Sequence, residues 1–138
     1  MAKTITWIDA AVQAKLNNGE GLESVFVDGD VQFQAANDDV LATVDLHVTD
    51  PFSITGRVAN VQRAGGGGFS GTTVTPSADG TVSKGRIRNS AGVVQGTFLV
   101  ALTGGAGADD AVFTFNNLAW NTGTDVSFTA DFTLTHPA

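Results

Sequence analysis

The chain has 138 residues, of which 42% are hydrophobic and 15% charged, with 17 glycines and no cysteine. It is long enough to bury one core, and its low charge and high apolar content exclude an intrinsically disordered protein. The net charge of −7, with only seven lysines and arginines, opposes binding to the phosphate backbone of nucleic acids. The lack of cysteine excludes disulfides and thiolate chemistry.

The chain shows no linker and no repeat of fixed period, so we expect one domain over residues 1–138. No apolar run is long enough to span a bilayer, and the first residues lack a signal-peptide pattern. We therefore expect synthesis in the cytoplasm and no membrane partner.

The first predicted element is a short N-terminal α-helix. Thr6 can cap it, and Asp9 follows three residues later, which is the spacing of a capping box. Apolar residues recur at helical spacing from Ile8 to Leu16, and Asn18-Gly19 is typical of a left-handed helix end. A helix of about three turns is marginal alone, so we expect it to pack on a sheet.

From residue 22 onward the apolar period changes to two, which predicts β-strands. Alternation and turn residues predict strands at 31–35, 40–48, 82–88, 93–102 and 112–120. The turn 89–92 makes a hairpin of the third and fourth of these. The clearest alternation runs from Val126 to Leu134 and predicts one long strand. The series predicts a mainly β fold, an antiparallel sandwich or barrel-like domain that carries the N-terminal helix.

Several acidic and glycine-rich segments have both a chemical and a structural interpretation. Asp28-Gly29-Asp30 resembles part of a calcium loop, but Asp-Gly between apolar pairs favours a hairpin turn. Asp38-Asp39 and Asp109-Asp110 could hold a cation, although solvated acids are the usual finding in such loops. The run Gly65–Gly68 favours a flexible surface loop that contacts a partner, because no lysine follows it as a phosphate loop requires.

The histidines and aromatic residues give no catalytic set. His47 alternates outward on a predicted strand and His136 lies near the C-terminus, so neither is placed as a base for a serine. We predict no enzyme, no metal and no cofactor. Trp7, Phe69 and Trp120 are the aromatic candidates for a sugar-binding surface, with packing in the core or at its rim favoured for the two tryptophans.

Four motifs, taken in order, resemble a family of small structural proteins of tailed-bacteriophage particles. They are Ala-Ala-Asn-Asp at 35–38, Asp-Pro-Phe at 50–52, Arg-Ile-Arg-Asn-Ser-Ala-Gly-Val-Val at 86–94, and Phe-Thr-Leu-Thr-His-Pro-Ala at 132–138. The resemblance extends in outline from end to end of the chain, and none of the motifs is catalytic.

The resemblance implies a virion structural protein, with a head decoration (cement) protein on the capsid surface as the favoured role. It implies the major capsid protein and further copies of this chain as partners, in a homo-oligomer such as a trimer. Most of the positive charge lies on Arg57, Arg63, Arg86 and Arg88, which could meet acidic loops of a neighbouring subunit or lie on solvated strand faces. The C-terminal strand with His136 and Pro137 could pair with another subunit. A tail, neck or baseplate component and a carbohydrate-binding adhesin module are the alternatives.

Overall fold

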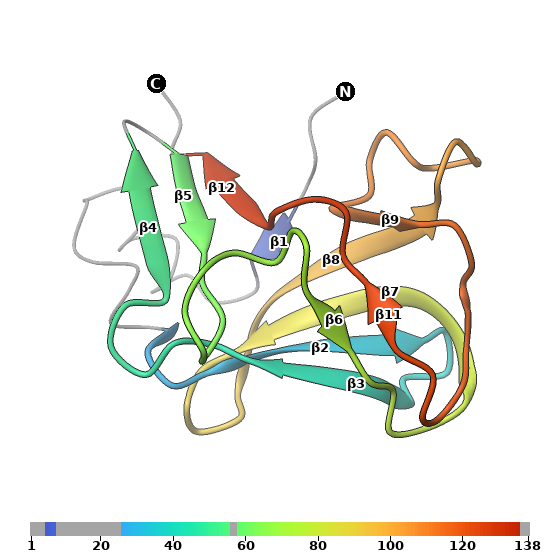
Figure 1. The fold of residues 1–138 in the computed structure, drawn as a ribbon, viewed down its shortest axis with the longest axis horizontal. Coiled ribbons are helices and arrows are strands. Elements are labelled where there is room, and N and C mark those ends of the chain that lie inside the picture. The colour runs from blue at the N-terminus through green and yellow to red at the C-terminus, as the bar shows by residue number, and fades with distance from the viewer. Residues whose placement is uncertain (1–4, 8–25, 56–57, 136–138) are drawn as a thin grey trace.

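A computed structural model of the chain describes residues 5–7, 26–55 and 58–135, and this part is mainly β (Figure 1). Its strands are β1 (Ile5–Trp7), β2 (Asp30–Ala35), β3 (Val40–Asp45), β4 (Phe52–Thr55), β5 (Val58–Val61), β6 (Thr73–Val74), β7 (Gly80–Arg88), β8 (Val94–Leu102), β9 (Phe113–Phe115), β10 (Ala119–Trp120), β11 (Val126–Ser127) and β12 (Thr133–Thr135). They form a large sheet of seven strands, a pair of β6 and β11, and a three-stranded sheet of β4, β5 and β12.

The large sheet has the order β1-β8-β7-β2-β3 and curls into a half-barrel, while β9 and β10 pair with β8 and β7. The predicted hairpin is confirmed, because β7 and β8 are antiparallel around the turn 89–92. The Asn89 side chain closes this turn: Oδ1 accepts hydrogen bonds from the backbone N–H groups of Ala91 and Val93, each at 3.0 Å. Gly92 supplies the positive φ of 79° that the turn requires.

The predictions for the two edge strands of the large sheet, β1 and β3, were wrong in part. Thr6 and Trp7, predicted to begin a helix, lie in β1, which pairs antiparallel with β8. Backbone pairing with β8 at this edge outweighs the local capping signal; the rest of the predicted helix, 8–19, lies outside the described residues. The strand predicted at 40–48 ends at Asp45, and a bridge from Leu46 to Arg63 follows.

The strand predicted at 112–120 is two short strands with different partners. β9 runs parallel to β8, whereas β10 is antiparallel to β7. The parallel pair departs from the expected all-antiparallel fold. Asn117 causes the break, because its Oδ1 accepts a hydrogen bond from the backbone N–H of Ala119 at 2.9 Å and so turns the chain.

The long strand predicted at 126–134 is also broken. β11 pairs with β6 and β12 pairs with β5, so the chain passes from one sheet to another between them (Figure 1). Phe128 and Phe132 point into the core as predicted, but Ala130 between them is exposed at a bend. Asp131 fixes the passage, because its carboxylate accepts from the backbone N–H of Ser70 at 2.9 Å and from Asn60 Nδ2 at 3.3 Å.

One aromatic cluster joins these sheets. Phe33 on β2 has no exposed surface, and its ring centroid lies 5.5 to 6.3 Å from those of five other aromatic rings. These five are Phe98, Phe113, Phe115, Trp120 and Phe128. Phe69 and Phe132 extend the cluster toward the three-stranded sheet. The aromatic cluster therefore packs against the concave inner face of the half-barrel, and polar side chains occupy the opposite face.

Candidate functional site

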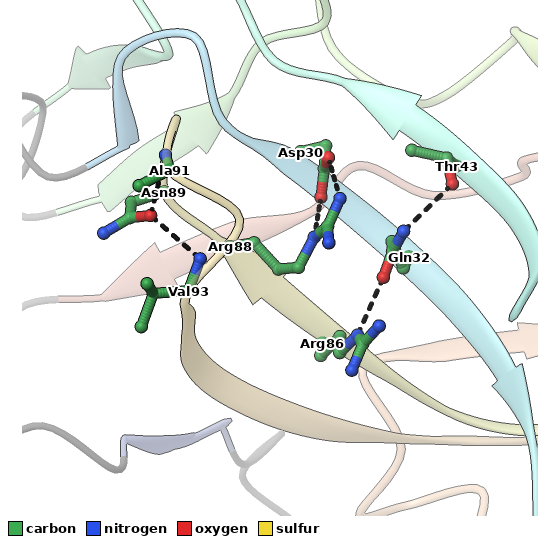
Figure 2. A network of polar contacts seen from close by, with 8 residues as sticks. All are labelled: Asp30, Gln32, Thr43, Arg86, Arg88, Asn89, Ala91 and Val93. Carbon is green, nitrogen blue, oxygen red and sulfur yellow. Dashed lines mark hydrogen bonds and ion pairs between the residues drawn. The ribbon is translucent and has the colours of Figure 1, made fainter. Parts of the chain in front are cut away.

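Polar side chains gather on the face of the large sheet opposite the aromatic core. Val31 and Phe33 of β2 point into the core, so the alternate residues Asp30 and Gln32 point to the other face. The strand register places charged and polar partners directly opposite them on β7 and β3. We call this set the polar face, and it consists of Asp30, Gln32, Thr43, Arg86 and Arg88 (Figure 2).

Arg88 and Asp30 form a bidentate ion pair across β7 and β2. Arg88 Nε and Nη2 donate to the two carboxylate oxygens of Asp30 at 2.8 and 2.6 Å (Figure 2). The two side chains are only 24% and 16% exposed, so the pair is partly shielded from water. The hydrogen bonds to Asp30 raise the pKa of Arg88 above its already high ordinary value. Both charges are thus fixed in place on the sheet.

The Gln32 side chain on β2 links its two neighbouring strands, β7 and β3. Its Oε1 accepts a hydrogen bond from Arg86 Nε at 2.7 Å, and its Nε2 donates to Thr43 Oγ1 at 3.4 Å (Figure 2). Gln32 is a neutral partner, and no described carboxylate forms an ion pair with Arg86. Arg86 therefore carries a positive charge that is positioned but not neutralised within the described part of the molecule.

The polar face is bordered by a second ion pair and by an exposed apolar side chain. Lys84 on β7 pairs with Asp38 in the β2–β3 turn, and its hydrogen bond and charge lower the pKa of Asp38. Leu99 lies opposite Lys84 on β8 and is 55% exposed. The face thus offers the guanidinium of Arg86, which no described carboxylate pairs, together with two ion pairs and an apolar side chain.

The structure brings together two of the residues singled out from the sequence and separates the others. Arg86 and Arg88 are neighbours on the polar face, as their spacing on one strand requires. Phe69 and Trp120 are 0% and 2% exposed, so neither offers a ring on an open surface. The packing in the core that was favoured for Trp120 is confirmed, whereas the choice of Phe69 as an interaction residue was wrong. Their rings pack against other aromatic rings, which removes far more apolar surface from water than a surface position would.

The remaining candidates lie at the edge of the described chain or beyond it. Trp7 lies in β1 opposite Gly96 of β8. His136 and Pro137 lie outside the described residues.

The glycine run is organised by Arg63, through a contact within the chain that was not predicted for this arginine. Arg63 Nε donates to the carbonyl oxygen of Gly68 at 2.8 Å, and its Nη2 donates to that of Gly66 at 2.9 Å. The backbone N–H of Arg63 also donates to Gly67 O at 3.0 Å. Residues 65–68 form a loop as predicted, and this loop is folded around one guanidinium group. An arginine two residues before the run was the available signal.

The acidic segments and His47 take structural roles. A turn forms at Asp28-Gly29, where Gly29 N–H donates to Phe26 O at 2.9 Å, but Phe26 and Val27 before it are not in a strand, so the predicted hairpin is not formed by these residues. His47 follows β3, and its Nδ1 accepts from the backbone N–H groups of Thr49 and Asp50 at 3.2 and 2.9 Å. Over residues 5–7, 26–55 and 58–135, no three His, Cys, Asp or Glu side chains are grouped to hold a metal ion.

Comparisons with protein-family models, with curated proteins and with solved structures find no match. None of the helices among the described residues is long and apolar enough to cross a membrane.

Proposed function

We propose that this protein is a non-enzymatic structural component of a tailed-phage particle, and specifically a head decoration protein that binds the major capsid protein on the outside of the shell. The class rests on the resemblance of the motifs at 35–38, 50–52, 86–94 and 132–138. The observation that carries a docking role is the polar face, where Arg86 keeps a positioned, unneutralised charge beside the exposed Leu99.

Such a face suits binding to a large, regular protein surface. Its side chains are already held by cross-strand hydrogen bonds, so docking costs little side-chain entropy. The guanidinium of Arg86 can form a specific polar contact with a partner, and the side chain of Leu99 can be buried against it. Arginine and apolar side chains are commonly combined in this way in protein interfaces. Each copy needs only modest affinity, because many identical contacts on one lattice add their effects and reinforce the shell.

The test is to add the purified chain to phage heads that lack it and to count bound copies by quantitative gel analysis and cryo-electron microscopy. We expect copies in a fixed ratio to capsid subunits, bound on the outer surface. Binding to tails or necks alone, or a few copies at one vertex, would overturn the decoration role and favour the alternative position in the virion.

Two variants test whether the polar face makes the contact. Arg86→Ala is expected to weaken head binding about fivefold and to reduce its dependence on salt. Leu99→Ser should also weaken binding, whereas the matched control Val48→Ser should not, because Val48 is similarly exposed at 54% but lies after the end of β3, outside the strands that carry the polar face. Equal effects of both serine variants would contradict docking through this face.

A further inference from the structure

A depression of about 300 Å³, with both polar and apolar lining, lies between β9, β10 and β11, on a different part of the molecule from the polar face. It is formed by one stretch of chain, 114–129, which curves around it, together with Thr103 just after β8. Its volume is at the small end of the range for ligand sites, about 300–1,000 Å³. That size suits a single small ring rather than a peptide or a large cofactor.

The lining of the depression is rich in hydroxyl and amide groups. Nine of its thirteen residues carry a hydroxyl, amide or carboxylate side chain, and Asp125 is the one charged residue among them. Amides and hydroxyls both donate and accept hydrogen bonds, as the hydroxyls of a sugar do. An anionic ligand is disfavoured, because the single lining charge is negative and the chain carries a net charge of −7.

Several polar groups at the rim are available to a ligand. Asn116 and Asn121 are exposed, and neither side-chain amide forms a hydrogen bond with another described residue. Asp125 is positioned by a hydrogen bond from Thr75 Oγ1 to its Oδ1, and its Oδ2 accepts no hydrogen bond from another described residue. Three residues from one curved segment can therefore converge on the same small ligand.

The floor and walls of the depression are held in place before any ligand arrives. Phe115 and Trp120 contribute to the lining, and their rings meet edge to face with centroids 5.2 Å apart. The Trp120 indole Nε1 donates to Asn117 O at 3.3 Å, and Thr103 N–H donates to Phe115 O at 2.9 Å. Fixed walls reduce the ordering cost of binding, which matters most for a weakly bound ligand.

We propose that this depression binds a neutral, hydroxyl-rich ligand, namely one sugar unit, through Asn116, Asn121 and Asp125. A single sugar ring fits the volume, the mixed donors and acceptors satisfy its hydroxyls, and the apolar floor accepts its C–H groups. Sugar binding here does not depend on capsid docking, since the residues of the two surfaces are separate. Loss of one function would therefore leave the other measurable.

The test is an NMR titration of the ¹⁵N-labelled full chain with glucose, galactose and N-acetylglucosamine, and then with disaccharides of each. We expect shifts of the Asn116 and Asn121 side-chain amides and of the Trp120 indole N–H, with a Kd in the millimolar range. A response to monosaccharides indicates a free or terminal sugar, and a response to disaccharides alone indicates a unit within a glycan chain. No response to any sugar would overturn the proposal, as would a response to inorganic phosphate in their place.

Matched variants separate the site from general stability. Asn116→Ala and Asn121→Ala should each weaken sugar binding about fivefold or more while the Trp120 indole signal keeps its position in the free protein. Asn37→Ala is the control, because Asn37 is an exposed asparagine in the β2–β3 turn, outside the depression. Unchanged sugar binding in both rim variants, or an equal loss in the control, would contradict the assignment.

Discussion

At the residue scale, Asp30 lies between two charged residues of opposite sign, one on each neighbouring strand. Arg88 on β7 binds it through two hydrogen bonds, while Asp45 on β3 lies opposite it with the same charge. Asp30→Ala removes the partner of a partly buried guanidinium and is expected to lower the free energy of unfolding by about 1–2 kcal/mol. Urea denaturation of the wild type and of Asp30→Ala measures this difference in the free energy of unfolding.

Asp45→Ala is the control for this change. Asp45 is exposed and no ion pair joins it to another described residue, and like charges opposite each other on neighbouring strands are destabilising. Its removal should leave stability unchanged or raise it slightly. A loss as large as that of Asp30→Ala would show that the ion pair with Arg88 is not the cause.

Asp79 provides a pH-dependent contact between two loops. Its Oδ1 accepts hydrogen bonds from the backbone N–H of Thr122 at 2.6 Å and from the Thr122 hydroxyl at 2.8 Å. The backbone bond first, and then the hydroxyl bond, lower the pKa of Asp79 below its ordinary value of 3.8. A lowered pKa in the folded state stabilises the fold above the unfolded value and loses this effect as the pH falls through the folded value.

We therefore expect the stability difference between the wild type and Asp79→Asn to be constant above about pH 5 and to shrink below about pH 4. Melting temperatures measured across this range test the expectation, and a ¹³C titration of the Asp79 carboxyl gives its pKa directly. A carboxyl that titrates at or above 3.8 would contradict the role of Thr122.

At the element scale, β7 and β8 approach closely where Gly85 faces Phe98. A methyl group on Gly85 would clash with the Phe98 ring and come within 2.9 Å of the Gln32 carbonyl oxygen. Gly85→Ala should therefore destabilise the protein by about 1–3 kcal/mol through overpacking. Gly65→Ala is the control, since the nearest atom to its added methyl is 3.9 Å away and its φ is not positive. Thermal unfolding of both variants measures the difference, and equal melting temperatures would contradict the close approach.

Alternation predicted the elements whose partners are near in sequence. β2 and the β7–β8 hairpin follow from period-two patterns, and Asn89 and Gly92 mark the turn between the hairpin strands. The C-terminal segment shows the limit of the same rule. Phe128 and Phe132 both point into the core although the chain passes from one sheet to another between them. The alternation of apolar and polar residues therefore does not reveal this passage. The cause is Asp131, whose partners Ser70 and Asn60 are 61 and 71 residues away.

The candidate site was predictable to a similar extent. Arg86 and Arg88 could be chosen because they share one face of a strand and carry much of the positive charge. Their partners Gln32 and Asp30 lie 54 and 58 residues away. The difference between Arg88, which is paired with a carboxylate, and Arg86, whose described hydrogen-bond partner is a neutral amide, therefore appears only once β2 and β7 are in register. Burial of Phe69 and Trp120 likewise depends on rings from distant strands.

At the scale of the whole molecule, the aromatic cluster argues for cooperative unfolding. Phe33 comes from the large sheet, Phe128 from the passage between β11 and β12, and Phe69 from the loop that follows the glycine run. Rings from each of these parts contact one another, so no sheet retains its buried face when another is lost. Such mutual dependence is the condition for a single unfolding transition.

Phe33→Ala tests this dependence, because Phe33 is fully buried at the centre of the cluster. The substitution should lower the free energy of unfolding by about 3–5 kcal/mol and the melting temperature by roughly 10 °C or more. Leu99→Ala, at a half-exposed position on β8, should change it by less than about 0.5 kcal/mol. Far-ultraviolet circular dichroism and tryptophan fluorescence should report the same transition in the wild type and in both variants. Separate transitions by the two probes would mean that the three-stranded sheet or the β6–β11 pair unfolds independently, and the shared core would then be too weak to join them.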